Sequence, residues 1–183
     1  MPTLPRPTLL ALAAVAALSA CASISPSATM AVDNARLPEA VRVPAEARYR
    51  STSTGIGEII YECRDKKDAA GQFEWAFVAP VATLYGPGQQ VVGKYYAGPT
   101  WEASDGSRVG GKQVAVAPAA PGSIALQLVK AEPAVGSGAM QGVTYIQRLK
   151  TMGGVAPVAP CAMANKGEKK QVAYQADYVF YGR

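Results

Sequence analysis

Apolar and polar side chains alternate along most of the chain from about residue 55 onward, a period typical of β-strands that bury one face. In the longest such run, Val172, Tyr174, Ala176, Tyr178 and Phe180 all fall on one face. The segments with this pattern are 58–63, 73–79, 91–96, 113–116, 123–130, 143–151 and 171–181. We therefore predict a strand in each of them. We expect no long helix after residue 41, because the 3.6-residue period is missing there.

Turn-forming residues separate the predicted strands. Gly-Pro-Gly at 86–88, Asp-Gly-Ser at 105–107 and Gly-Gly at 153–154 are examples, and the chain holds 18 glycines and 14 prolines. Short strands at this spacing predict an all-β domain over residues 42–183, built as an antiparallel β-sandwich or a barrel with Gly/Pro-rich loops.

The N-terminal segment has a different pattern. Arg6 is its first charged residue, and residues 9–18 are continuously apolar. This predicts a signal peptide over residues 1–20, since the apolar run is too short for a membrane span. The ending Leu18-Ser19-Ala20-Cys21 is similar to a bacterial lipobox, which indicates a lipoprotein with palmitate or a related acyl chain on Cys21. The alternative is an ordinary signal peptide cut near residues 20–22, which would leave Cys21 as an incidental thiol.

Residues 21–41 are rich in Ala, Ser and Pro and show no sustained apolar period, so we expect a tether that begins at the lipidated cysteine. Ala22 follows Cys21, and the aspartate that retains lipoproteins in the inner membrane is missing. The expected location is therefore the cell envelope, with the protein exported and anchored to the outer membrane by lipid.

Two further cysteines, Cys63 and Cys161, lie in the predicted domain. In an exported protein two remaining cysteines most often pair, so we predict a disulfide. The alternatives are two separate thiols or a soft-metal site, although two thiolates without histidine or a C-x-x-C spacing are a weak ligand set.

The chain contains no histidine. This excludes Ser-His-Asp and Cys-His nucleophile pairs and histidine-ligated zinc or haem. Gly55 and Gly57 do not begin a dinucleotide fingerprint, because a third glycine and a following helix are missing. We therefore expect neither a metal nor a cofactor.

The densest group of functional side chains lies between residues 95 and 107. The candidate ligand patch comprises Tyr95, Tyr96, Trp101, Glu102 and Asp105. Aromatic rings beside carboxylates are typical of sugar-binding grooves, and the two acids offer a candidate glycosidase pair. The alternative interpretation places Trp101 in the core, Asp105 in a hairpin turn and Glu102 in solvent.

Several charged residues allow other interpretations. Arg148 and Asp177 fall inside apolar strands, where each can pair with the other or with another charge across the sheet. The basic run 166–170 is expected in a solvated loop, where the net charge of +5 permits contact with anionic lipid or glycan. No motif for nucleic-acid binding is present, so we expect no such partner.

Five motifs in this order resemble the bacterial and fungal family called domain of unknown function 3455. They are Gly55-x-Gly57-x3-Tyr61-x-Cys63, Trp75-x-Phe77-x2-Pro80-x-Ala82-x-Leu84, Tyr96-Ala97-Gly98-Pro99-Thr100-Trp101-Glu102, Tyr145-Ile146-Gln147-Arg148 and Tyr174-x-Ala176-Asp177-Tyr178-x-Phe180-Tyr181. The resemblance covers residues 38–183 and implies a secreted β-rich domain with no catalytic residue to carry over. The family commonly has a His-Tyr pair where Tyr95-Tyr96 stands in this chain.

These observations favour a non-enzymatic envelope lipoprotein that binds a small ligand, a glycan or an envelope protein, or that has a structural role. The alternative is a hydrolase or isomerase that uses carboxylates and tyrosines around residues 95–107. A structure distinguishes them by showing whether Glu102 and Asp105 face one cleft.

Overall fold

The computed structural model describes residues 32–183. The predicted signal peptide, Cys21 and the first part of the predicted tether lie outside the described residues. Within residues 32–183 the only helical elements are 3-10 turns, namely η1 (Asn34–Arg36), η2 (Glu39–Val41), η3 (Pro87–Gln89) and η4 (Met163–Asn165). The strands are β1 (Arg48–Asp65), β2 (Phe73–Tyr85), β3 (Val91–Tyr96), β4 (Thr100–Ala103), β5 (Arg108–Ala117), β6 (Leu126–Ala131), β7 (Tyr145–Gly153) and β8 (Lys169–Gly182). No helix in this part of the chain is long and apolar enough to span a membrane.

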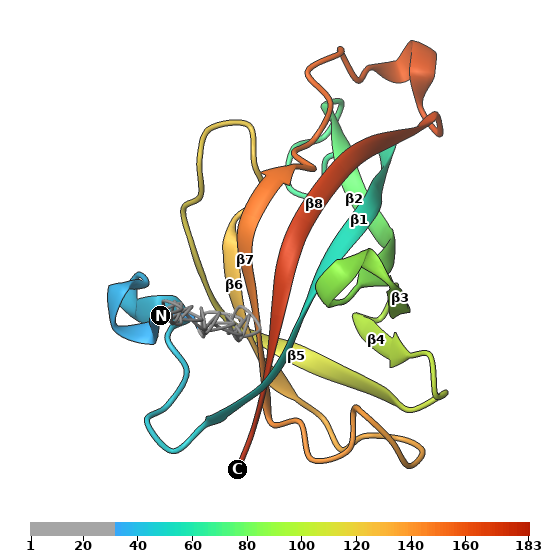
Figure 1. The fold of residues 1–183 in the computed structure, drawn as a ribbon. Coiled ribbons are helices and arrows are strands. Elements are labelled where there is room, and N and C mark those ends of the chain that lie inside the picture. Colours follow the sequence, from blue (N-terminus) through green and yellow to red (C-terminus); the bar gives the residue numbers. More distant parts are fainter. Residues whose placement is uncertain (1–31) are drawn as a thin grey trace, which may run out of the picture. The chain divides into compact units, whose positions relative to one another are not determined.

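The strands form one closed antiparallel barrel in sequence order, with β8 pairing back onto β1 (Figure 1). The prediction of an all-β domain is confirmed, and of the two architectures considered the chain adopts the barrel. All seven predicted strands are present. The strand β4 was not predicted, because four residues between two turns are too few to display an alternation.

An inner core lies inside the barrel and contains inward-facing side chains from every strand, including Trp75, Tyr95, Ile146 and Tyr178. A barrel of eight strands has an interior that side chains can fill. Gly55 makes room for the ring of Tyr178, since a Cβ at this position would lie 2.6 Å from Cε2 of that ring.

A second, outer core lies between the barrel wall and the segment that precedes β1. Val41 and Val43 pack there against outward-facing residues that include Leu149 and Val179. The fully buried Gln147 fastens this segment, because its Nε2 donates a hydrogen bond of 2.6 Å to the carbonyl of Val41. The predicted tether is therefore corrected at its C-terminal end. Residues 34–41 belong to the domain because their few apolar side chains cover an apolar patch of the barrel wall. The amino-acid composition of this segment alone cannot reveal that contact, because the patch is formed by distant residues.

The strands differ in how far they extend, and the barrel wall is incomplete at one end. Strand β3 pairs only with residues 81–85 of β2, so residues 73–80 of β2 pair only with β1. Figure 1 shows β1, β2 and β8 reaching the upper end of the domain, while β3 and β4 stay in the lower part. The inner face of β2 is therefore not enclosed by β3 at this end.

Candidate ligand site

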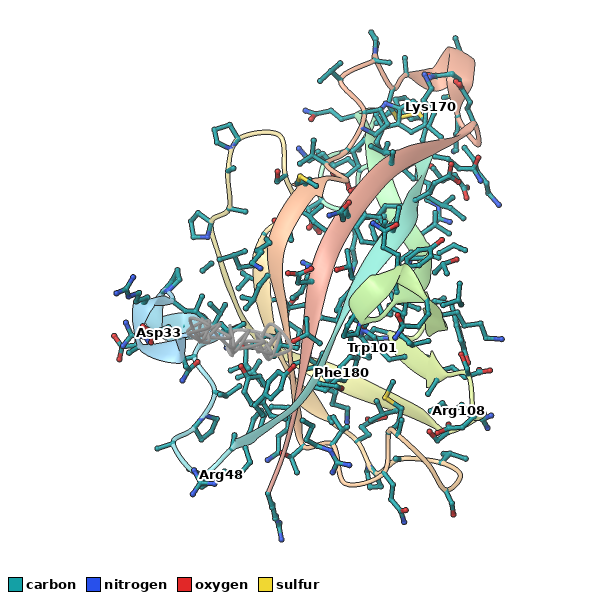
Figure 2. The ribbon with its side chains drawn as sticks, in the orientation of Figure 1. Asp33, Arg48, Trp101, Arg108, Lys170 and Phe180 are labelled. Carbon is teal, nitrogen blue, oxygen red and sulfur yellow. A yellow bond between two sulfur atoms is a disulfide. The ribbon has the colours of Figure 1, made fainter. Side chains whose placement is uncertain are left out.

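The five residues of the predicted ligand patch do not share one surface. Tyr95 on β3 lies directly opposite Trp101 on β4, and both are buried inside the barrel with their ring centroids 4.7 Å apart. Figure 2 labels Trp101 in the middle of the barrel. Lys94 lies opposite Glu102, so Lys94, Tyr96 and Glu102 are on the outer face. The predicted patch is corrected for a simple reason: consecutive residues of a strand point to opposite faces of the sheet.

On the outer face, Glu102 is held as a carboxylate. Its Oε2 accepts a hydrogen bond of 2.7 Å from the Tyr96 hydroxyl, and its Oε1 lies 3.1 Å from Nζ of Lys94. The hydrogen bond from Tyr96, followed by that from Lys94, lowers the pKa of Glu102. Glu102 and Lys94 line a surface hollow of about 460 Å³ together with residues that include Ser104.

Asp105 organises the turn between β4 and β5. Its Oδ1 accepts hydrogen bonds from the backbone N–H and the hydroxyl of Ser107, at 2.8 and 2.6 Å. Its Oδ2 accepts one of 2.7 Å from the N–H of Ala139 in a distant loop. The Ser107 hydroxyl, followed by the two N–H groups, lowers the pKa of Asp105. Gly138 lets this loop approach, since a Cβ there would lie 2.2 Å from Oδ2.

This geometry does not support the hydrolase interpretation of residues 95–107. A glycosidase pair needs one carboxylic acid that stays protonated until it donates to the leaving group, and its pKa is raised. Both Glu102 and Asp105 have a lowered pKa. The Asp105 carboxylate accepts three hydrogen bonds from the turn between β4 and β5 and from the loop that contains Ala139. Its role is therefore structural.

The predicted disulfide between Cys63 and Cys161 is confirmed. It joins the end of β1 to the loop that leads from β7 to β8. The same loop is held by Trp75, whose Nε1 donates a hydrogen bond of 2.7 Å to the carbonyl of Ala159. Figure 2 shows the yellow disulfide bond at the upper end of the domain, near Lys170.

Asp177 and Arg148 do not pair with each other. Asp177 lies on the outer face, where it accepts a hydrogen bond from Thr54 and forms an ion pair of 3.0 Å with Lys150. Arg148 lies on the inner face, where its Nε and Nη2 both donate to the carbonyl of Ala125, at 3.2 and 2.9 Å. The prediction that an acid in these strands pairs with a charge across the sheet holds for Asp177 with Lys150.

The register places Arg148 in a row of inward-facing side chains that crosses four strands. Arg148 lies directly opposite Tyr178 on one side and Gln127 on the other, and Gln127 lies opposite Val116. Directly opposed residues share a face of the sheet. Because Tyr178 is part of the inner core, the whole row faces inward.

A second row crosses three strands near the incomplete end of the wall. It contains Phe77, Tyr61 and Lys170, which are also directly opposed. Phe77 contacts Tyr61 edge to face, with ring centroids 6.3 Å apart. The Tyr61 hydroxyl donates a hydrogen bond of 2.7 Å to the carbonyl of Gly154.

Two inward-facing apolar residues are exposed to solvent even though they point into the barrel. Phe77 is 57% exposed and Val116 is 45% exposed. We define the exposed inner face as these two residues together with Arg148, Gln127 and Gln113. Gln113 belongs to it because it lies opposite the inward-facing Val129 and accepts a hydrogen bond of 2.6 Å from Gln127. Solvent therefore reaches an apolar side chain in each of the two inward-facing rows, and in the row of Val116 hydrogen-bonding groups lie beside it.

Four tyrosines of the inner core have raised pKa values. Burial raises the pKa of Tyr95 to about 12 and raises the pKa values of Tyr61, Tyr174 and Tyr178. The positive charge of Arg148 acts in the opposite direction on all four pKa values. Burial is the largest effect on each of these pKa values, so the four hydroxyls stay protonated at neutral pH.

The comparison with protein families decides how the chain is classified. A family model described as "Protein of unknown function (DUF3455)" matches residues 44–89 and 86–182. The chain belongs to the DUF3455 family. Curated proteins and solved structures provided no match.

In this DUF3455 domain, Tyr95 stands at the position where the family pattern led us to expect a histidine. The structure places Tyr95 inside the barrel, between Trp101 and Tyr178, with ring centroids 4.7 and 4.9 Å away. The side chain at this position therefore packs in the core.

Sequence reasoning missed the exposed inner face of the DUF3455 barrel. Phe77 and Val116 were assigned to strands without any sign that solvent reaches them. The available signal was Arg148, a charged residue at an inward position of an apolar strand. Within one strand, however, nothing indicated that its neighbours would be Tyr178 and Gln127.

Proposed function

We propose that this protein is an exported, lipid-anchored envelope protein that binds a small molecule and does not transform it. The observation that carries the binding role is the solvent exposure of Phe77 and Val116 on the inner face of the barrel. Apolar side chains beside a few hydrogen-bonding groups are the usual composition of small-molecule sites.

The proposed anchor is a diacylated Cys21, supported by the apolar run before it and by the small residues at positions 19 and 20. Stable membrane attachment needs more than one acyl chain, which an N-acylated and diacylated cysteine supplies. Ten residues separate Cys21 from Val32, the first described residue. Even fully extended, this length of chain spans roughly 40 Å, so the anchor would hold the barrel close to the outer membrane.

Palmitate labelling tests the anchor. Cells that express the full chain are expected to incorporate labelled palmitate into the protein, because the acyl chains are attached to Cys21. The variant Cys21→Ala is expected to lose the label completely, and Cys161→Ala is expected to keep it. A label that persists in Cys21→Ala, or a wild-type chain without label, would show that the lipobox interpretation is wrong.

The proposed ligand has an apolar body that fits against Phe77 and Val116. Both residues keep about half of their surface in water although their neighbours in the same rows, Tyr61 and Tyr178, are buried. Burial of apolar surface is worth about 25 cal/mol per Å², so covering such side chains favours binding. Gln113 and Gln127, with amide groups beside this surface, can orient a polar substituent.

Binding of the neutral fluorescent dye N-phenyl-1-naphthylamine tests this site. Both tryptophans of the chain, Trp75 and Trp101, belong to the inner core, so energy transfer from tryptophan to the dye reports dye bound near the barrel. With the purified full chain, Phe77→Ala is expected to weaken dye binding about fivefold or more, because the aromatic contact is lost.

The matched control is Val81→Ala. Val81 is 54% exposed on the same strand, but it faces outward, since it pairs with the outward-facing Tyr96. Its replacement is expected to leave dye binding unchanged. Equal effects of the two substitutions, or no saturable energy transfer in the wild-type chain, would show that the inner face is not a binding site.

A further inference from the structure

We infer that the ligand of the exposed inner face is an organic anion, an apolar or aromatic molecule with one carboxylate- or sulfonate-like group, and that Arg148 binds this group. This inference rests on the proposed function and adds the chemical class of the ligand.

The first argument is that Arg148 has no acidic partner. It forms no ion pair within residues 32–183, and the carbonyl of Ala125 is the one acceptor that its guanidinium contacts there. A guanidinium carries five N–H donors, so three of them remain without a partner among these residues. Its planar donor set matches a carboxylate or a similar oxyanion.

The second argument is the charge of the inner face. Among the strand residues that the register places inward, Arg48, Arg148 and Lys170 are positive, and the one acid is Asp65 at the end of β1, which already pairs with Lys166. The other acids on the strands of the barrel wall lie on the outer face, where cations pair with Glu102 and Asp177. The inner face therefore attracts anions.

The third argument concerns Lys170, which is already engaged. Its Nζ lies 5.0 Å from the centroid of the Trp75 ring and 3.6 Å from Oε1 of Glu168. Arg148 lies opposite Tyr178, and beside it on the same row are Gln127 and Val116. The unpaired charge and an exposed apolar contact thus belong to one row of side chains, which is the arrangement an amphiphilic anion requires.

A pair of dyes with the same ring system tests this inference. The dye 8-anilinonaphthalene-1-sulfonate carries a sulfonate that N-phenyl-1-naphthylamine lacks. We expect the purified full chain to bind the anionic dye about tenfold more tightly than the neutral one, measured by energy transfer from tryptophan. Arg148→Gln is expected to remove this difference in affinity and to leave the affinity for the neutral dye within about twofold of the wild-type value. Arg148→Lys is expected to keep part of the preference for the anionic dye. Lys112→Gln, on the outer face opposite Lys130, is the control for a general loss of charge.

The possible results separate this inference from the function on which it rests. If the wild-type chain binds both dyes equally, or if Arg148→Gln leaves the preference intact, the anion is not recognised by Arg148 although the binding role stands. If neither dye binds, the binding role itself is wrong. Should Arg148→Gln fail to fold, the salt dependence of the wild-type chain tests the inference. Raising the salt concentration should weaken binding of the anionic dye and leave binding of the neutral dye unchanged.

Discussion

Reduction of the Cys63–Cys161 disulfide is expected to lower the free energy of unfolding by about 4–5 kcal/mol. The bond closes a loop with a sequence separation of 98 residues, and for a loop of roughly 100 residues the chain-entropy model gives about 4.7 kcal/mol. A loss of this size is a large part of the stability of a domain, which is typically about 5–15 kcal/mol. Urea unfolding of the full chain, with and without a reductant, measures it.

The control separates the cross-link from the packing of the sulfur atoms. Cys63 is fully buried, so the double variant Cys63→Ala with Cys161→Ala removes core volume as well as the bond. We expect it to be less stable than the reduced wild-type chain by the additional cost of that cavity. Equal urea midpoints for the oxidised and reduced chains, with reduction verified by mass spectrometry, would contradict the prediction.

The second large effect is expected for Trp101→Ala, which should lower the free energy of unfolding by about 3–5 kcal/mol. Trp101 is fully buried, stacks on Tyr95 and meets Tyr178 edge to face with ring centroids 5.6 Å apart. Loss of the indole leaves a cavity that three strands of a closed barrel cannot fill by moving. Chemical unfolding followed by far-UV circular dichroism measures the change.

Two other substitutions make this result specific. Trp101→Phe keeps an aromatic ring and removes an indole N–H that has no hydrogen-bond partner within the described residues. It should therefore lower the free energy of unfolding by less than Trp101→Ala does. Glu102→Gln changes the next residue of β4, which faces outward, and should have a much smaller effect. If Glu102→Gln destabilised the protein as much as Trp101→Ala, the assignment of inner and outer faces would be wrong.

Most of the strands could be predicted because the information is local. In the segment 171–181, each alternate residue from Val172 to Phe180 is apolar, and all five of these residues face the inner core. The same rule could have separated Tyr95 from Tyr96 in the predicted patch, since neighbours on a strand point in opposite directions. The turn around Asp105 was also recognisable, but its bond to Ala139 was not, because 34 residues separate the two.

By itself, the sequence of this DUF3455 domain determined the all-β class, the approximate positions of seven of the eight strands and the disulfide. Each of these depends on the alternation of side chains along one strand or on the count of cysteines. Only the tertiary structure decided that Arg148 meets Tyr178 and Gln127, that residues 34–43 cover the barrel wall, and that Phe77 stays exposed inside the barrel. The register between strands, the closure of the sheet and the early end of β3 produce these contacts, and each is a relation between residues that are distant in the chain.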